Sequence, residues 1–266
     1  AYIPSLCDEV VIVRDQAFMY LGGPELTKAA TGEDVDRDSL GGAQMHSSVS
    51  GVTDYIAEND EHALAITRDI MAELGEEAPT RWTPKASKPP RLDPNEIYGL
   101  ISRDARIPTD NREILLRMVD GSEFQEFKPL YGDTLICGFA RIHGFQIGIL
   151  ANQGVFFTEA ALKGTQFIDI CTKRDIPLLF LSDVAGFMVG REAEVGGIAK
   201  AGAKFVTAMS SAAVPKYTVV SGGAYGAGYL AMCSRQFKPR ALFMWPHSRI
   251  AIMGPEQAAN TLAMVK

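Results

Sequence analysis

The chain has 266 residues, 47% of them hydrophobic and 22% charged, which is ordinary for a globular protein with a substantial core in one large or two modest domains. Its 26 basic and 32 acidic residues give a net charge of −6, which argues against nucleic-acid binding and against a basic membrane-surface protein. No apolar run reaches the roughly 18 residues of a bilayer span. Cys7, Cys137, Cys171 and Cys233 form no CxxC pair, so we expect neither a zinc cage nor a disulfide framework, and a reducing compartment.

The first 78 residues contain four periodic segments. The pattern predicts short strands at Val10–Val13 and Phe18–Leu21, a helical turn at Glu25–Ala30, and a helix at Asn59–Leu74 that Asn59 caps and Gly75 ends. Five prolines then fall within Pro79–Pro94, among basic residues. Because proline disrupts the hydrogen bonding of helices and sheets, we expect an extended, solvated linker at 79–94. The domain boundary is therefore predicted there, between residues 1–78 and 95–266.

Helices and strands alternate after the linker. The predicted elements are a helix at Asn111–Val119, paired strands at Leu135–Arg141 and Phe145–Ala151 turning at His143–Gly144, a helix at Glu159–Arg174, a strand at Pro177–Ser182, a helix at Glu192–Ala213, a strand at Tyr217–Ser221, a helix at Ala224–Cys233, a strand at Ala241–Met244 and a helix at Pro255–Lys266. This alternation predicts an α/β structure whose strands are covered by helices.

Glycine clusters follow two of these strands. Ser221–Gly228 (SGGAYGAG) opens a predicted helix, where unshielded main-chain amides can bind a developing oxyanion. The alternative is tight packing of helix against sheet with no ligand. Ser182–Gly190 (SDVAGFMVG) either lines a pocket with Phe187 and Met188 or is an ordinary connection in which Asp183 forms a turn.

Other motifs are weak or absent. Gly226, Gly228 and Ala231 fit GxGxxA, but no acidic residue follows at the distance that a dinucleotide site requires. No GxxxxGK[ST], GxSxG or HExxH occurs. His46 and His247 are isolated, and no Ser/His/Asp trio can be assembled. The remaining possibility is a site of main-chain donors suited to an enolate or ureido anion.

Several stretches together resemble the carboxyltransferase (β) component of biotin-dependent acyl-CoA carboxylases. They are Ala1–Val13, Gly22–Glu33, Leu40–Tyr55, Tyr131–Gly144, Phe156–Ile168, Gly186–Lys204 (GFMVGREAEVGGIAKAGAK), Ser221–Arg235 (SGGAYGAGYLAMCSR) and Met253–Asn260. The GFMVGRE and GGAYGAG runs are most similar to the methylcrotonyl-CoA and geranyl-CoA branch. The resemblance implies an α/β fold of two crotonase-like (ClpP/crotonase superfamily) ββα-spiral domains, each incomplete here.

The resemblance also implies a mechanism. Carboxybiotin from the biotin carboxylase/biotin carrier (α) subunit releases CO₂, the biotin nitrogen deprotonates the acyl-CoA, and the enolate attacks CO₂. No side-chain base and no metal are expected. The ureido oxygen would be held by the amides of Ala227 and Gly228, the biotin channel would be lined by Gly186, Phe187 and Gly226, and Leu230 would limit the size of the acyl group.

One departure from the family pattern concerns the amide pair that holds the thioester carbonyl. In the family this pair is a Gly-Gly directly ahead of a stretch like Ala1–Pro4, which the sequence starts too late to contain. We therefore expect a central fragment that shows no carboxyl transfer by itself. The whole protein would be a homo-oligomer, cytoplasmic in a bacterium or in the mitochondrial matrix of a eukaryote.

Three alternatives remain open. A crotonase-type hydratase or isomerase needs a carboxylate near the thioester, and Glu159, Glu192 and Glu194 are the candidates, although each is better explained as a charge at a helix N-terminus. An acetyl- or propionyl-CoA carboxylase β chain would share the fold. A non-catalytic fragment would fold normally but bind neither biotin nor acyl-CoA.

Overall fold

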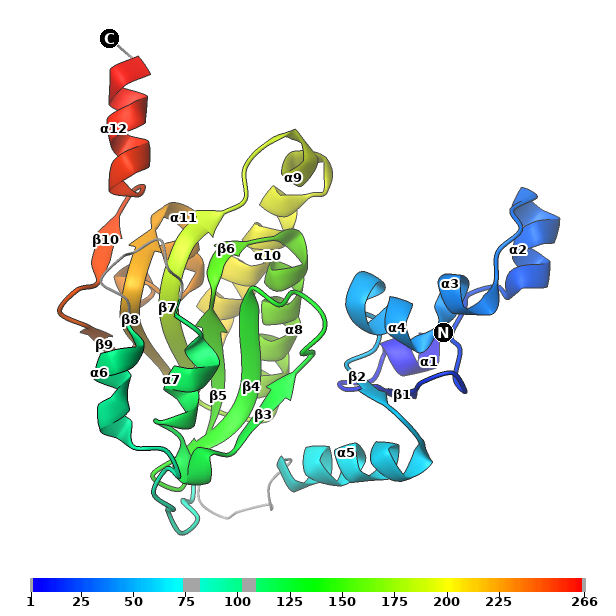
Figure 1. The fold of residues 1–266 in the computed structure, drawn as a ribbon, viewed down its shortest axis with the longest axis horizontal. Helices are drawn as coiled ribbons and strands as arrows, with labels where there is room; N and C mark the ends of the chain where they lie inside the picture. The colour runs from blue at the N-terminus through cyan, green and yellow to red at the C-terminus, as the bar shows by residue number, and fades with distance from the viewer. Residues whose placement is uncertain (1, 74–81, 102–108, 265–266) are drawn as a thin grey trace. The chain divides into compact units, whose positions relative to one another are not determined.

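The structure, a computed structural model, describes residues 2–73, 82–101 and 109–264. The chain divides into two compact units (Figure 1): Ala1–Glu77 with Phe127–Tyr131, and Ala78–Glu126 with Gly132–Lys266. The division after Glu77 falls next to the predicted linker. In the described part of the chain, no helix has the length and apolar character needed to cross a bilayer.

The first unit is built from short elements around a two-stranded parallel sheet. Its elements are α1 (Tyr2–Ser5), β1 (Val11–Val13), α2 (Pro24–Thr31), α3 (Arg37–Gly41), α4 (Ala43–Met45), a π-helical turn (His46–Ser50), β2 (Tyr55–Ala57) and α5 (Asp60–Glu73). The sheet pairs β1 with β2, with Ile12 opposite Ile56. The helix predicted at Glu25–Ala30 is confirmed as α2, which ends at Gly32 in a left-handed conformation (φ +79°).

Two other predictions for this unit can be compared with the structure. Asn59 caps α5, since its Oδ1 accepts a hydrogen bond from the His62 amide at 2.8 Å, whereas Leu74 and Gly75 lie outside the described residues. The strand predicted at Phe18–Leu21 is wrong. Met19 donates one main-chain bond to the Gly41 carbonyl (2.9 Å), but among the described residues no neighbouring strand provides a ladder, and β1 pairs with the distant β2 instead.

The second unit is an α/β structure around an eight-stranded sheet. Its strands are β3 (Phe124–Phe127), β4 (Leu135–Ile142), β5 (Phe145–Asn152), β6 (Gly154–Phe156), β7 (Leu178–Phe187), β8 (Lys216–Tyr225), β9 (Ala241–Met244) and β10 (Arg249–Ala251). The order is β10-β8-β7-β5-β4-β3, with β6 beside β7 and β9 beside β8. The predicted β4–β5 hairpin is confirmed as antiparallel, and its turn residues His143 and Gly144 have positive φ angles of 51° and 83°.

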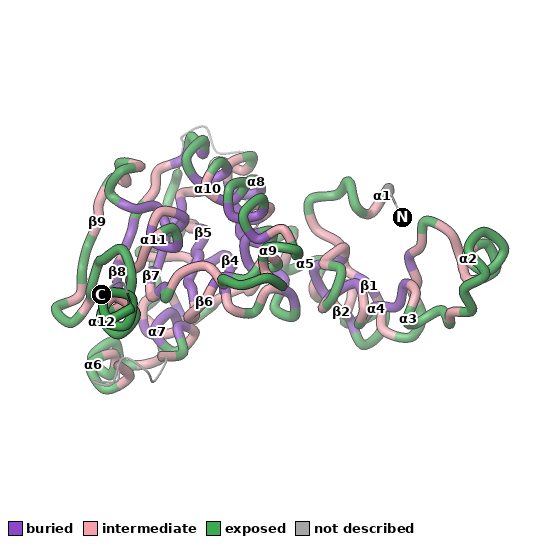
Figure 2. Tube along the Cα trace, turned by 90° about the horizontal axis from the view of Figure 1, so that it is seen from above, coloured by how far each residue is buried: buried purple, intermediate pink, exposed green. Residues whose placement is uncertain are grey.

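Helices cover both faces of this sheet, as predicted (Figure 1). Those of the second unit are α6 (Ile97–Leu100), α7 (Asn111–Leu116), α8 (Thr158–Lys173), α9 (Arg191–Val195), α10 (Ile198–Ser211), α11 (Gly226–Ala231) and α12 (Pro255–Met264), with 3₁₀ turns at Pro94–Glu96, Asp120–Ser122 and Arg235–Phe237. Side chains alternate along β4: Phe139 contacts Phe167 of α8, at 5.0 Å between ring centroids, whereas Ile136 and Ala140 pack in a cluster with Leu115 of α7. The central strands β4, β5, β7 and β8 contain most of the buried strand residues, whereas β9, β10 and α12 bury none of theirs (Figure 2).

Several predicted boundaries differ from the observed ones. The helix predicted at Glu192–Ala213 is two helices, α9 and α10, because Gly197 between them has a φ of +78°, outside the helical region. The helix predicted at Ala224–Cys233 is only α11, because β8 continues to Tyr225 through its pairing with β10, which the sequence pattern missed. β7 likewise continues through the predicted connection after Ser182 and pairs with β6.

The described part of the predicted linker, from Trp82 on, is extended but attached to the second unit. Trp82 Nε1 donates to the Asp175 carbonyl at 2.7 Å, and the Lys85 amide donates to the Gly144 carbonyl at 3.1 Å. A Cβ on Gly144 would lie 2.0 Å from the Lys85 oxygen, so the chain segments are in close contact here. Residues 82–89 are exposed, as expected of a solvated connector, although these hydrogen bonds hold parts of the segment against the second unit.

Candidate functional site

The predicted site residues gather where β7 and β8 end, next to the start of α11. β8 leads directly into the helix at Gly226, which has a positive φ of 53°. Ala227 and Gly228 are the second and third residues of α11, so their N–H groups have no acceptor within the helix, and no side chain caps it. Ala227 is exposed, whereas Gly228 is buried.

Protein contacts explain why glycine stands at four positions of Ser221–Gly228. A Cβ on Gly222 would lie 2.2 Å from Asp183 Oδ1, one on Gly223 2.7 Å from the Tyr225 ring, and one on Gly226 2.9 Å from the Ile252 carbonyl oxygen. A Cβ on Gly228 would lie 2.5 Å from Val184 Cγ2. At each of these distances a Cβ would force a neighbouring atom to move. The glycines themselves therefore reflect tight packing, and the argument for a ligand rests on the amides that they leave unshielded.

The structure brings the two glycine clusters of the sequence together. A Cβ on Gly228 would lie 3.1 Å from the Cα of Gly186, which is near the end of β7. Gly186 has a φ of +133°, a conformation that residues with a side chain rarely adopt, and apart from its chain neighbours no atom of the described residues lies within 4 Å of the position its own Cβ would take. Open space therefore lies beside Gly186, and Gly186 itself adjoins the first turn of α11.

Phe187 and Leu230 are placed differently from each other. The Phe187 ring is half-buried, stacks on Phe156 at 5.1 Å between centroids, and lies against Gly202 of α10. Leu230 is half-buried on α11, one turn after Gly226. A cleft of about 480 Å³ lies next to the end of β7. It is lined by the segment from Met188 to Ala193 and by Phe157, Thr158, Glu159, Gly196 and Ile198.

Asp183 is not a turn residue, in contrast to one of the two sequence interpretations. It lies within β7, and its Oδ1 accepts a hydrogen bond from the Gly223 amide at 2.8 Å. Burial raises the pKa of the Asp183 carboxyl, while the Gly223 N–H and the charge of His247 oppose this shift. Sequence reasoning missed this contact because the two residues are 40 positions apart.

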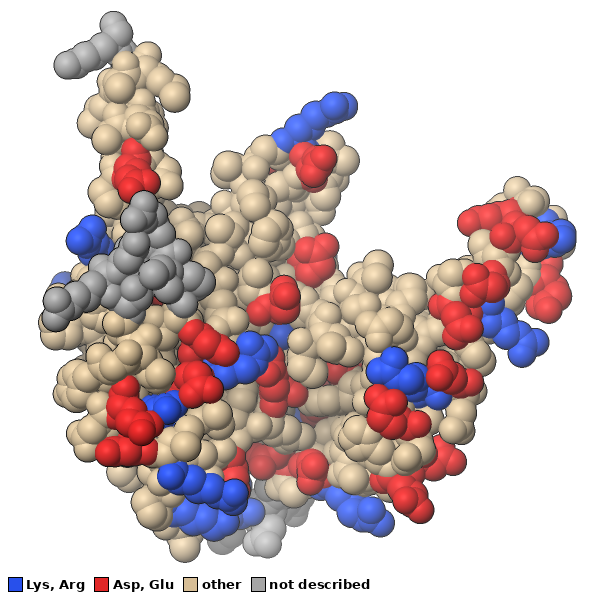
Figure 3. All heavy atoms as spheres, in the orientation of Figure 1, with Lys and Arg blue, Asp and Glu red and all other residues tan. Residues whose placement is uncertain are grey.

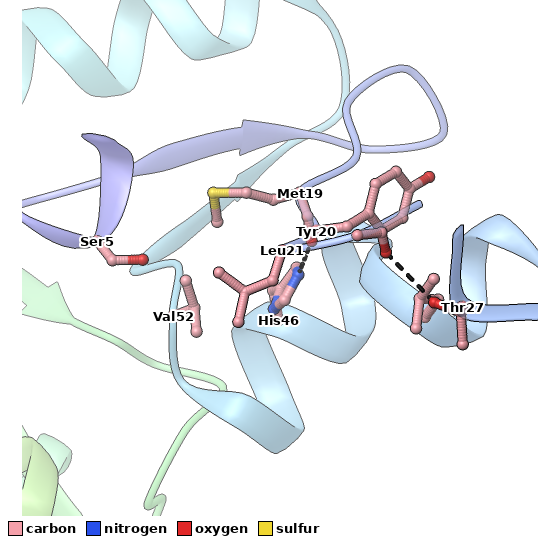
Figure 4. Close-up of a pocket in the computed structure, with 9 residues that line it drawn as sticks. Ser5, Met19, Tyr20, Leu21, Thr27, His46 and Val52 are labelled. Carbon is pink, nitrogen blue, oxygen red and sulfur yellow. Dashed lines mark hydrogen bonds between the residues drawn. The ribbon is translucent and has the colours of Figure 1, made fainter. Parts of the chain in front are cut away.

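The two histidines noted in the sequence lie in different surroundings. His247 is exposed, and its ring centroid lies 6.1 Å from that of Trp245. His46 is buried in the first unit, beside an apolar pocket of about 490 Å³ that Met19, Leu21 and Val52 also line (Figure 4). His46 Nε2 lies 2.6 Å from the Met19 carbonyl oxygen, so this nitrogen carries a proton, and Nδ1 lies 2.8 Å from Ser50 Oγ. Both nitrogens of His46 thus have structural partners.

Ionisable groups are spread out rather than concentrated at the site. Glu159, Glu192 and Glu194 are all exposed, and Glu159 and Glu192 line the cleft beside Met188. Among the described residues, no group of three or more His, Cys, Asp or Glu side chains could hold a metal ion. Acidic and basic side chains are interspersed on the face drawn in Figure 3. Main-chain donors therefore remain the candidate chemistry of the site.

The donor set fits a planar anion that carries its charge on oxygen. Ala227 and Gly228 offer two neighbouring N–H groups without an intrahelical acceptor, and consecutive amides at a helix start stabilise negative charge. Gly186, which has open space on its Cβ side, packs against this turn. The ureido oxygen of biotin is such an acceptor, so the residues present fit this group.

A mostly parallel α/β sheet with main-chain donors at its rim defines a class of proteins that bind ligands where strands end. The chain matches the carboxyl transferase domain family over residues 1–266 and belongs to that family.

Relatives at high identity narrow the family assignment. The chain is 55% identical over 266 residues to the biotin-dependent 3-methylcrotonyl-coenzyme A carboxylase beta1 subunit of Mycobacterium tuberculosis, covering 100% of the chain and 50% of that protein. It is 49% identical over 281 residues to the probable mitochondrial methylcrotonoyl-CoA carboxylase beta chain of Drosophila melanogaster, covering 100% and 49%. The predicted resemblance to the methylcrotonyl branch is confirmed. The chain spans about half the length of these relatives.

The fold also matches a solved structure. The transcarboxylase 12S crystal structure, described as a hexamer assembly with hydrolysed methylmalonyl-coenzyme A bound, superimposes with a TM-score of 0.90 at 37% identity. The match covers 100% of this chain and 53% of that one.

Proposed function

We propose that the chain is part of the carboxyltransferase component of a biotin-dependent acyl-CoA carboxylase that acts on a methylcrotonyl-CoA-like substrate. Membership of the carboxyl transferase family and relatives named as methylcrotonyl-CoA carboxylase β chains support this proposal. The structural observation that carries it is the amide pair of Ala227 and Gly228 in a helical turn against which Gly186 packs.

Carboxybiotin, when bound, supplies CO₂ and a nitrogen that takes a proton from the acyl-CoA, so that the carbanion formed there can bond to CO₂. The Ala227 and Gly228 N–H groups donate to the ureido oxygen and stabilise its negative charge as CO₂ leaves. Gly186 would leave room for the planar ring and Phe187 would border it, whereas Gly226, whose missing side chain accommodates the Ile252 carbonyl, would line the channel through its main chain. Leu230 contacts the acyl group and limits its size. These are main-chain and steric roles, and none requires an ionisable side chain.

The wider assembly belongs to the same proposal. The chain would contribute to two crotonase-like domains, joined at 79–94 between residues 1–78 and 95–266. The partner would be an α subunit that carries biotin, because the relative in Mycobacterium tuberculosis is named as a β1 subunit of a biotin-dependent enzyme. A homo-oligomer is supported by the hexamer assembly of transcarboxylase 12S. The compartment would be the mitochondrial matrix in a eukaryote and the cytoplasm in a bacterium.

Proline substitution tests the amide donor directly. Ala227→Pro removes one N–H at the second position of a helix, where proline is sterically tolerated. In the complete protein with its biotin-bearing partner, we expect kcat for carboxyl transfer to fall about 100-fold, the usual effect of losing one oxyanion donor. Ala199→Pro is the matched control, because Ala199 is also an exposed second residue, of α10. It should leave transfer near the wild-type rate.

Two outcomes would favour the alternatives. Hydration of crotonyl-CoA by the wild-type protein, lost in Glu159→Gln, would indicate a crotonase-type hydratase. Folded wild-type protein that binds neither biotin nor acyl-CoA in calorimetry would indicate a non-catalytic role. Equal rates in Ala227→Pro and wild type would remove Ala227 from the proposed site.

A further inference from the structure

The register between β7 and β8 changes abruptly next to the proposed site. Ser182 pairs with Val220 and Val184 pairs with Ala224, so Asp183 alone faces the three residues from Ser221 to Gly223. The extra residues form a bulge in β8, two residues before α11 begins. Bulges next to functional sites redirect the chain that follows them.

The Asp183 carboxylate replaces the main-chain acceptor that this bulge displaces. Asp183 Oδ1 accepts from the Gly223 amide at 2.8 Å, and Gly222 has no side chain because a Cβ there would lie 2.2 Å from the same oxygen. β10 holds the opposite edge of the same segment, with Arg249 opposite Gly223. The carboxylate thus supports the side of the bulge that β10 does not reach.

The residues after Asp183 continue the same support up to α11. Val184 pairs with Ala224. A Cβ placed on Gly228 would lie 2.5 Å from Val184 Cγ2 and 3.1 Å from Gly186 Cα, so both residues pack against Gly228. β7 therefore touches the β8–α11 segment at its bulge, at its strand end and in the first helical turn. Of these β7 residues, Asp183 contacts the β8–α11 segment through a side-chain hydrogen bond.

We propose that Asp183 is a positioning residue for carboxyl transfer: by holding the Gly223 amide, its carboxylate fixes the bulge of β8 and thereby the direction of the Ala227 and Gly228 N–H groups. This inference rests on the proposed function of those two amides. Asp183 itself touches no substrate. An acceptor at Oδ1 is required, and a negative charge is not.

Three variants and a control separate these requirements. Asp183→Asn keeps an acceptor oxygen. Asp183→Leu removes this oxygen but keeps a side chain of similar size. Gly222→Ala leaves Asp183 in place but adds a methyl group that displaces its carboxylate. Asp169→Leu, at an exposed carboxylate on α8, controls for loss of charge.

Amide hydrogen exchange of residues 222–228, measured by mass spectrometry on the complete protein, requires no biotin. We expect exchange about tenfold faster in Asp183→Leu and Gly222→Ala, because the Gly223 N–H loses its acceptor, and near-wild-type exchange in Asp183→Asn and Asp169→Leu. Unchanged exchange in Asp183→Leu and Gly222→Ala would overturn the inference.

Kinetics in the complete, biotin-loaded assembly test the link to the reaction. We expect Asp183→Leu and Gly222→Ala to lower kcat at least about tenfold, with the KM for acyl-CoA changed less than about twofold, since a misdirected donor affects the transition state. Asp183→Asn should restore most of the rate. Faster exchange with an unchanged kcat would refute positioning, whereas a wild-type assembly without any transfer would instead refute the proposed function and leave the exchange result standing.

Discussion

Lys163, in the middle of α8, is fully buried, and within the described part of the chain its Nζ has no hydrogen-bond partner. Burial lowers the pKa of its ammonium group because the surroundings disfavour the charged form. A buried polar group without a partner costs free energy. This residue therefore destabilises the fold around it.

We expect Lys163→Met to raise the free energy of unfolding by about 1–3 kcal/mol at pH 7, measured by urea denaturation, because Met fills the same space without a charge. Between the lowered folded-state pKa and the unfolded value of 10.5, the unfolded state binds more protons, so wild-type stability rises with pH in that window. The advantage of the Met variant should shrink there. Lys200→Met, on the exposed side of α10, serves as the control. A loss of stability in Lys163→Met would contradict this argument.

At the scale of elements, a buried ion pair ties the segment after β3 into the first unit. Lys128 Nζ lies 3.0 Å from Asp54 Oδ1, with both side chains at most 3% exposed, and it also donates to the Gly51 carbonyl. The Val10 amide donates to Asp54 Oδ2 at 2.6 Å. Burial raises the pKa of the Asp54 carboxyl to about 6, although Lys128 and the Val10 N–H oppose it.

Removing one member of this pair leaves a buried charge alone. We expect Lys128→Met to lower the free energy of unfolding of the first unit by about 3–5 kcal/mol. The loss should be smaller at pH 5 than at pH 7, because a protonated Asp54 carries no charge. Lys28→Met breaks the exposed pair with Asp34 (2.8 Å) and should cost less than about 1 kcal/mol. Equal losses in the two variants, by hydrogen exchange of β1 and β2, would contradict the burial argument.

At the scale of the whole molecule, burial divides the four free thiols into two classes. Cys7 is exposed, whereas Cys137, Cys171 and Cys233 are buried. Burial raises the pKa of the Cys137 thiol to about 12 and that of Cys233 to about 11, which suppresses the reactive thiolate.

A native chain should therefore show one thiol that reacts rapidly with Ellman's reagent at pH 8, and three more only after denaturation. Cys7→Ser should abolish the fast phase and leave the slow one. Two or more fast thiols in the wild type, or a fast phase that persists in Cys7→Ser, would show that the buried strands and α8 open readily.

Local sequence signals predicted those elements that depend mainly on neighbouring residues. The β4–β5 hairpin follows from alternating side chains around His143–Gly144. The bounds predicted for α8 lie within one residue of the observed ones, because its helical pattern of apolar residues repeats over 16 residues. The wrong predictions concern segments whose secondary structure depends on pairing with a strand that is distant in the sequence. Phe18–Leu21 has strand composition but no ladder, and β8 extends to Tyr225 because β10 pairs with it.

The sequence alone determined the α/β class and the family, because these depend on periodicity and on motifs that are contiguous along the chain; its assignment of the amide pair stays a prediction. Only the tertiary structure decided that Gly186 lies against Gly228, that β7 and β8 run on as strands, and that Asp183 holds Gly223. Such contacts join residues some 40 positions apart and depend on the register between strands. Register is set by the packing of the whole sheet, which no local pattern contains.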